Sequence, residues 1–111
     1  MIIVEKNEGP KIPYEVTGKK VCFDDDLTIN LTKREQDDAV HIDICYDADR
    51  ELVIGAAAGR AYVAEIDIPA RRYEEVENPD YDPDDPQSQQ YIIQPVPLDM
   101  DTVTLTLWAI E

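Results

Sequence analysis

The chain has 111 residues, of which 25 are acidic and 10 are basic, so its formal net charge at pH 7 is −15. With 43% hydrophobic residues, 8 prolines and 4 glycines, its composition is that of a globular protein rather than a disordered or fibrous one. This length predicts a single domain over residues 1–111. The excess of acidic residues argues against binding to nucleic acid or to an anionic membrane surface, because both depend on basic side chains.

The N-terminal residues and the two cysteines predict a cytoplasmic protein. The apolar run from Ile2 to Val4 is too short for the core of a signal peptide. No stretch approaches the ~18–20 apolar residues of a membrane span. Cys22 and Cys45 are therefore expected to be reduced thiols, and their spacing matches no zinc motif.

Apolar and polar residues alternate with a period of two in most of the chain, which is typical of strands with one solvated face. The longest alternating segments are 27–32, 40–46, 62–68 and 102–109, and the shorter ones are 2–5, 14–16, 19–23, 51–54 and 90–94. Turn-forming Asp, Gly and Pro residues separate them. The pattern predicts an all-β fold: a single-domain antiparallel β-sandwich or barrel of about seven to nine short strands.

The register of the first strands follows from the same alternation. A loop at 24–26 places Phe23 opposite Leu27, so that both strands turn apolar residues to one side. The segment 40–46 is then expected as the next strand of this meander, with both cysteines on the solvated side and too far apart for a disulfide. The segment Gly55–Gly59 is interpreted as a small-residue hairpin connection or as a close approach of backbones. Tyr62 is expected on the core face.

Residues 70–89 break the alternation and are predicted to form one long acidic loop. This segment contains three prolines and few apolar residues. All ten basic residues lie at or before Arg72, whereas residues 73–111 carry ten acidic residues and no basic one. Loops of more than about 12–15 residues are usually functional or disordered. The stretch Gln94 to Pro97 contains two prolines and is expected at a sheet edge.

Acidic side chains at every second position of this loop are similar to those of calcium-binding loops. They are Asn78, Asp80, Asp82 and Asp84. The sixth position of such a loop lacks its glycine, and three prolines hold the backbone extended, which excludes an EF-hand. An irregular, weak calcium site stays open, and a solvated acidic loop is favoured.

Two further groups of residues have the chemistry of a site but lack its geometry. His41, Asp43 and Cys45 share one strand face with neighbours about 7 Å apart, so at most two of them can bind one ion, with other ligands from elsewhere. Glu65 and Asp67 have the spacing of a glycosidase pair, but 25 acidic residues make such pairs frequent. With one histidine and no activated nucleophile, the chain is expected to have no catalytic residues, no metal site and no cofactor.

The function that these observations favour is a non-enzymatic protein-interaction or assembly module of unknown specific role. It would bind a protein with a basic surface, a second copy of itself included, through a sheet face and the acidic loop. The expected binding residues are Tyr73, Tyr81, Tyr91, Trp108, Asp80, Asp82, Asp84 and Asp85.

Each aromatic residue in this set also has a structural interpretation. The tyrosines can pin the loop to the sheet, and a second layer can cover Trp108. The alternative functions are an acidic nucleic-acid mimic that inhibits a DNA-binding enzyme, and a weak calcium-binding or enzymatic β-domain. In composition alone, the chain generically resembles small acidic all-β proteins of bacteria and their phages.

The net charge generates a first prediction, because 15 excess negative charges repel one another in the folded state. The melting temperature is expected to rise when NaCl is increased to about 0.5 M, since salt screens this repulsion. The melting temperature is also expected to rise when the pH is lowered from 8 to 6. Differential scanning calorimetry measures both effects, and a melting temperature indifferent to salt and pH would contradict the prediction.

Overall fold

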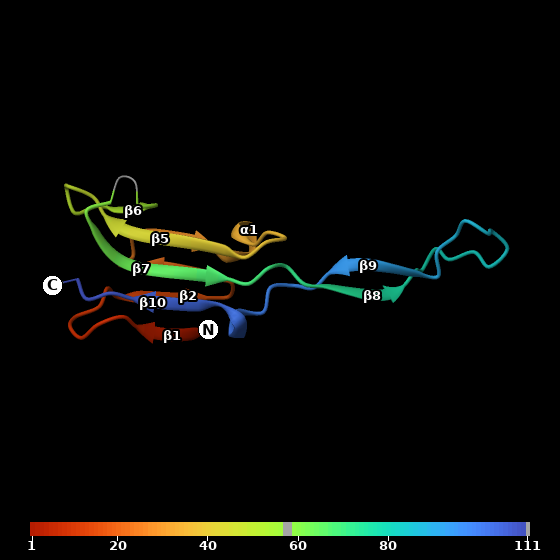
Figure 1. Ribbon diagram of the computed structural model, residues 1–111, viewed down its shortest axis with the longest axis horizontal. Coiled ribbons are helices and arrows are strands. Elements are labelled where there is room, and N and C mark those ends of the chain that lie inside the picture. Colours follow the sequence, from red (N-terminus) through yellow and green to blue (C-terminus); the bar gives the residue numbers. More distant parts are fainter. Residues whose placement is uncertain (57–58, 111) are drawn as a thin grey trace.

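The computed structural model describes residues 1–56 and 59–110, and within them the fold is all-β, as predicted. Ten strands form three open sheets, none of which closes into a barrel (Figure 1). Ten strands exceed the seven to nine expected. The strands are β1 (Ile2–Glu5), β2 (Tyr14–Thr17), β3 (Lys20–Phe23), β4 (Leu27–Asn30), β5 (Val40–Tyr46), β6 (Leu52–Ile54), β7 (Ala61–Ile68), β8 (Tyr73–Glu77), β9 (Tyr91–Pro95) and β10 (Thr104–Leu107).

Two of the sheets enclose the hydrophobic core. The five-stranded sheet has the order β1-β10-β7-β5-β6, and the three-stranded sheet has the order β2-β3-β4. All neighbouring strands are antiparallel except β1 and β10, which are parallel. Both sheets contribute to one cluster of buried side chains, which includes Phe23 and Ile29 from one sheet and Ile44, Ile66 and Leu105 from the other. We call these two sheets and their connections the body.

The hairpin β3–β4 has the predicted register, but the predicted meander is wrong. Phe23 pairs with Leu27, and the turn is made possible by left-handed backbone at Asp24 and Asp25 (φ 53° and 51°), which aspartate tolerates. β4 ends at Asn30, whose side chain accepts a hydrogen bond from the third residue of the one-turn helix α1 (Leu31–Arg34). The chain then leaves this sheet, and β5 pairs with β6 and β7 instead.

A β-bulge between β5 and β7 changes the predicted orientation of Tyr62. Ile44 pairs with Ala64, but Cys45 pairs with Tyr62, so Val63 is an extra residue in β7. Tyr62 is consequently exposed instead of facing the core. Its partner Cys45 lies on the same outer face, as predicted, but is 2% exposed instead of solvated. Burial raises the pKa of the Cys45 thiol.

Both cysteines are free, as predicted, although not for the predicted reason. Cys22 lies in the three-stranded sheet and Cys45 lies in the five-stranded sheet, so no single strand separates them. The thiol of Cys22 is half-buried.

In the connection between β6 and β7, the backbone at Gly59 approaches the side chain of Cys45 rather than another backbone. Residues 57–58 of the predicted segment Gly55–Gly59 lie outside the described part of the chain. The connection is not a hairpin, because β6 and β7 lie on opposite sides of β5. A Cβ atom on residue 59 would lie 2.6 Å from Cys45 Cβ and 2.8 Å from Cys45 Sγ. Gly59 therefore packs directly against the Cys45 side chain and covers it.

The substitution Gly59→Ala is expected to destabilise the protein by roughly 1–3 kcal/mol, because the new methyl group overlaps the Cys45 side chain. Chemical denaturation of both proteins measures this difference. In a Cys45→Ala background the overlap with Sγ is absent, so the same substitution is expected to cost less. An equal cost in both backgrounds would show that the contact with the thiol is not the cause.

The predicted long loop at 70–89 is wrong, because its first part forms β8. β8 pairs with β9 from Tyr73↔Pro95 to Glu77↔Tyr91, and residues 78–90 connect the two strands. We call residues 73–95 the arm. The arm projects from one end of the body (Figure 1), and the molecule measures 67 × 24 × 21 Å. Its radius of gyration of 19.1 Å exceeds the ~13 Å of a compact chain of this length.

The described residues contain no helix that is both long and apolar enough to cross a membrane.

Candidate functional site

The arm is a two-stranded ribbon with both faces solvated. One face carries the paired residues Tyr73 and Pro95, Glu75 and Ile93, and Glu77 and Tyr91. The other face carries Glu74 opposite Gln94 and Val76 opposite Ile92. Ile93 is 73% exposed, the highest value among the large exposed hydrophobic residues of the described chain. Sequence reasoning missed Ile93, because its neighbours resemble an ordinary half-buried strand.

The two edges of the arm differ in charge. β8 contains three glutamates, whereas β9 (Tyr91–Pro95) contains no charged residue. The whole arm carries seven carboxylates and no basic side chain. It therefore has one acidic edge and one neutral, largely apolar edge, each with backbone groups that no strand in the described residues pairs.

The tip of the arm uses its polar side chains to close local turns. Asn78 Oδ1 accepts a hydrogen bond from the Asp80 amide at 2.9 Å, and Asp82 Oδ1 accepts one from the Asp84 amide at 3.0 Å. Ser88 Oγ accepts a hydrogen bond from the Asp82 amide at 2.8 Å. The first two are Asx-type turns, in which a side-chain oxygen replaces a backbone acceptor. Two members of the alternating polar set, Asn78 and Asp82, therefore close turns of the tip with their side chains.

The root of the arm is fastened to the body through one arginine. The Arg71 guanidinium donates to the Glu35 carbonyl at 2.8 Å and lies 3.3 Å from Asp37 Oδ1. The Arg71 amide donates to the Gln36 carbonyl at 2.8 Å. The Tyr73 hydroxyl also donates to Asp37 Oδ1. Tyr73 therefore pins the arm to the body, which is the structural interpretation of this tyrosine.

The structure divides the predicted binding residues between two places. Those on the arm are Tyr73 at the root, Tyr91 in β9, and Tyr81, Asp80, Asp82, Asp84 and Asp85 in the tip. Trp108 follows β10 on the body, where it is half-buried. Its ring stacks on Tyr62 with centroids 5.1 Å apart, and its indole Nε1 donates to Glu65 Oε2 at 2.8 Å. The ammonium of Lys6 lies 5.5 Å from the ring centroid.

Next to Trp108, the outer face of the five-stranded sheet holds a cluster of one histidine and three carboxylates. Cross-strand pairing sets His41 opposite Asp67 and Asp43 opposite Glu65. His41 Nδ1 lies 2.6 Å from Asp67 Oδ1, and His41 Nε2 lies 2.7 Å from Asp43 Oδ1. Glu65 Oε1 lies 3.4 Å from the same Nε2. Cys45, which the sequence placed on the same strand face as His41 and Asp43, is covered by Gly59 and lies outside this cluster.

Hydrogen bonding makes His41 more basic than usual. The hydrogen bond to Asp67 raises its pKa above the ordinary value, burial opposes this, and Asp43 adds to it. A histidine with a raised pKa stabilises the fold at low pH, and this contribution is lost as pH rises through the folded-state pKa. Both this contribution and the net-charge effect therefore make the folded protein more stable at pH 6 than at pH 8. Salt separates the two, because it relieves the net repulsion but weakens the pairs of His41.

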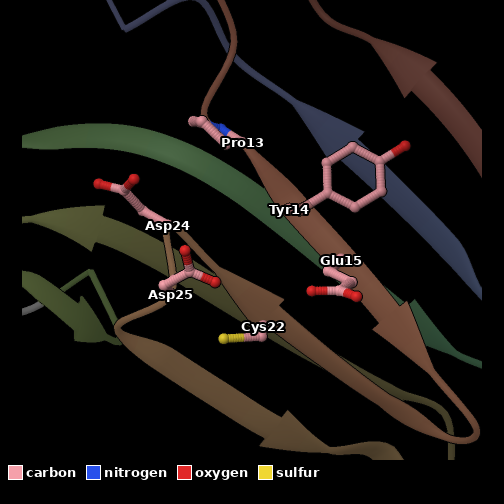
Figure 2. A pocket seen from close by; sticks show the side chains of 6 residues that line it. All are labelled: Pro13, Tyr14, Glu15, Cys22, Asp24 and Asp25. Atoms are coloured by element: carbon pink, nitrogen blue, oxygen red, sulfur yellow. The ribbon is translucent and has the colours of Figure 1, made fainter.

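A shallow hollow lies on the outer side of β2 and β3 (Figure 2). Its volume is about 210 Å³, and its lining includes the side chains of Glu15, Cys22, Asp24 and Asp25. This volume is below the roughly 300 Å³ at which small-molecule pockets begin. Its three carboxylates give this small hollow an acidic lining, beside Pro13 and Tyr14.

Comparisons with protein-family models, with curated proteins and with solved structures find no match to this chain. Its surfaces must therefore be interpreted from their own chemistry.

Loss of the contacts at the arm root is expected to loosen the arm while the body stays folded. In an Arg71→Gln/Tyr73→Phe variant, hydrogen-exchange protection of the Arg71 amide is expected to fall, because the side chains that hold it against Gln36 are gone. The free energy of unfolding is expected to change by less than about 1 kcal/mol, since these groups are partly exposed. The control is Arg72→Gln, whose pair with Asp99 is longer at 3.9 Å. Unchanged protection in the double variant would contradict this role.

Proposed function

We propose that the protein is a non-enzymatic assembly module that binds a protein partner through the arm. The observation that carries this proposal is the unsupported ribbon itself. An isolated two-stranded hairpin is at best marginally stable in water, and three strands or a packed face are usually needed. Here both faces of the ribbon are solvated and Ile93 is 73% exposed. A partner surface that covers Tyr91 and Ile93 would remove this apolar area from water.

The charge of the arm selects the kind of partner. Seven carboxylates without a basic residue favour a basic surface and reject an acidic one. The neutral edge at β9 offers free backbone groups, so the partner can add a strand there while its basic residues face β8 and the tip. Tyr81 and Tyr91 provide the aromatic contacts and the tip carboxylates increase the association rate. Tyr73 contributes indirectly, by fixing the direction of the arm.

We also propose that the protein functions in the cytoplasm. Cys22 and Cys45 are both free thiols in the fold, and the buried Cys45 packs under Gly59 without a partner cysteine. This arrangement needs no oxidising compartment.

The test compares a Tyr91→Ser/Ile93→Ser variant with the wild-type chain in affinity capture from host lysate and in sedimentation velocity. Loss of two apolar anchors, each worth about 1–3 kcal/mol, is expected to reduce capture or self-association at least tenfold. The matched control is Ile54→Ser, which removes an exposed isoleucine from the body.

Circular dichroism checks that all three proteins are folded. A monomeric wild-type protein that captures nothing would overturn the proposal. Equal losses in the arm variant and in the Ile54→Ser control would also overturn it, since binding would then not depend on the arm.

A further inference from the structure

The outer face of the five-stranded sheet carries a second feature, which is independent of the arm. It is the cluster of His41, Asp43, Glu65 and Asp67, contributed by the adjacent strands β5 and β7. In these strands residues alternate between faces, so the same pairing that buries Ile42 against Ile66 sets the four polar side chains together on the other face. His41 is the single imidazole of the chain.

We propose that His41 Nε2, Asp43 and Glu65 form a binding site for one divalent transition-metal ion, with Zn²⁺ as the best match. One ligand atom from each of the three side chains lies within 4.8 Å of the others. Zinc bound tetrahedrally at about 2.0–2.1 Å holds its ligand atoms about 3.4 Å apart. His41 Nε2 and Glu65 Oε1 are already at 3.4 Å. Asp43 Oδ1, at 2.7 Å from Nε2, needs to move outward by less than 1 Å.

Two neighbouring groups hold the ligands in the orientation that a metal needs. His41 Nδ1 is bonded to Asp67 Oδ1 at 2.6 Å, which leaves Nε2 as the nitrogen that faces Asp43 and Glu65. A carboxylate on the far nitrogen of a ligating histidine is the usual arrangement in zinc sites. The Trp108 indole donates to Glu65 Oε2 at 2.8 Å, and the other oxygen, Oε1, faces His41. Asp67 and Trp108 are thus positioning residues rather than ligands.

The donor set and the exposure decide the class of ion. One imidazole nitrogen with two carboxylates suits Zn²⁺ and similar transition metals, whereas Ca²⁺ and Mg²⁺ prefer oxygen ligands alone. The His41 side chain is 47% exposed, so an ion can enter from solvent and keep water at its fourth position. When the ion binds, Nε2 gives up its proton to solvent and donates its lone pair to the metal. The positive charge of the ion then offsets the negative charges of the three carboxylates around His41, which belong to Asp43, Glu65 and Asp67.

Titration calorimetry of the full chain with ZnCl₂ tests the site. The wild-type protein is expected to bind one equivalent and to melt at a higher temperature with Zn²⁺, because the ion binds only the folded state. Bound Co²⁺ is expected to show the strong visible absorption of four-coordinate cobalt. His41→Gln is expected to abolish both signals, and Glu65→Gln to weaken binding strongly.

Two further variants separate this site from general attraction of cations to an acidic protein. Asp82→Asn removes a carboxylate from the tip of the arm and is expected to leave zinc binding unchanged. Asp67→Asn is expected to weaken binding by about 10–100-fold through the orientation of His41. The His41 and Glu65 side chains lie on the solvated face, so the variants are expected to remain folded, as circular dichroism will check. Absence of stoichiometric binding, or binding that survives His41→Gln, would overturn the proposal.

Discussion

The position of β7 between β5 and β10 is the constraint on which the rest of the structure depends. Because side chains alternate along a strand, one face of β7 contributes Ile66 to the core while Glu65 and Asp67 point outward. The chain leaves β7 at Ile68 and enters β8 at Tyr73, so the same strand also determines where the arm begins. Core, outer cluster and arm are consequences of a single strand placement.

The bulge at Val63 connects this constraint to the aromatic pair on the outer face. Without the extra residue, strict alternation would turn Tyr62 into the core. With it, Tyr62 lies outside and stacks on Trp108, and the indole of Trp108 reaches Glu65. Cys45, which pairs with Tyr62, lies beneath Gly59, where an added Cβ atom would overlap its side chain. One inserted residue therefore shapes the surface next to His41.

The sequence predicted the fold class and the local hairpin because these depend on signals that are close together in the chain. Alternation shows which residues share a face, and the loop at 24–26 sets the register of two neighbouring strands. Alternation does not show which strands are neighbours. The pairing of His41 with Asp67 joins residues 26 positions apart, so the cluster could not be found from spacing along one strand.

The first strand of the arm, β8, escaped prediction for a different physical reason, whereas β9 corresponds to the strand expected at 90–94. A ribbon that is solvated on both faces needs no hydrophobic alternation, and the stretch from Tyr73 to Glu77 has none. Its prolines, which favoured a loop, lie in the tip or at the root end of β9 rather than within β8. The bulge likewise has no signal in the residue pattern.

The pairing within the arm explains how so acidic a ribbon can form. Each glutamate of β8 stands opposite an uncharged residue: Glu74 opposite Gln94, Glu75 opposite Ile93 and Glu77 opposite Tyr91. Like charges directly opposite one another destabilise a strand pair, and this arrangement avoids them. Gln94 Nε2 even donates to Glu74 Oε1 at 3.2 Å. Because the charges are separated in this way, Ile93 and Tyr91 have no apolar residue directly opposite them in the ribbon. Repulsion between strands of the arm is thus avoided by placing Ile93 and Tyr91 opposite glutamates, which leaves the apolar area of these two side chains open to another molecule.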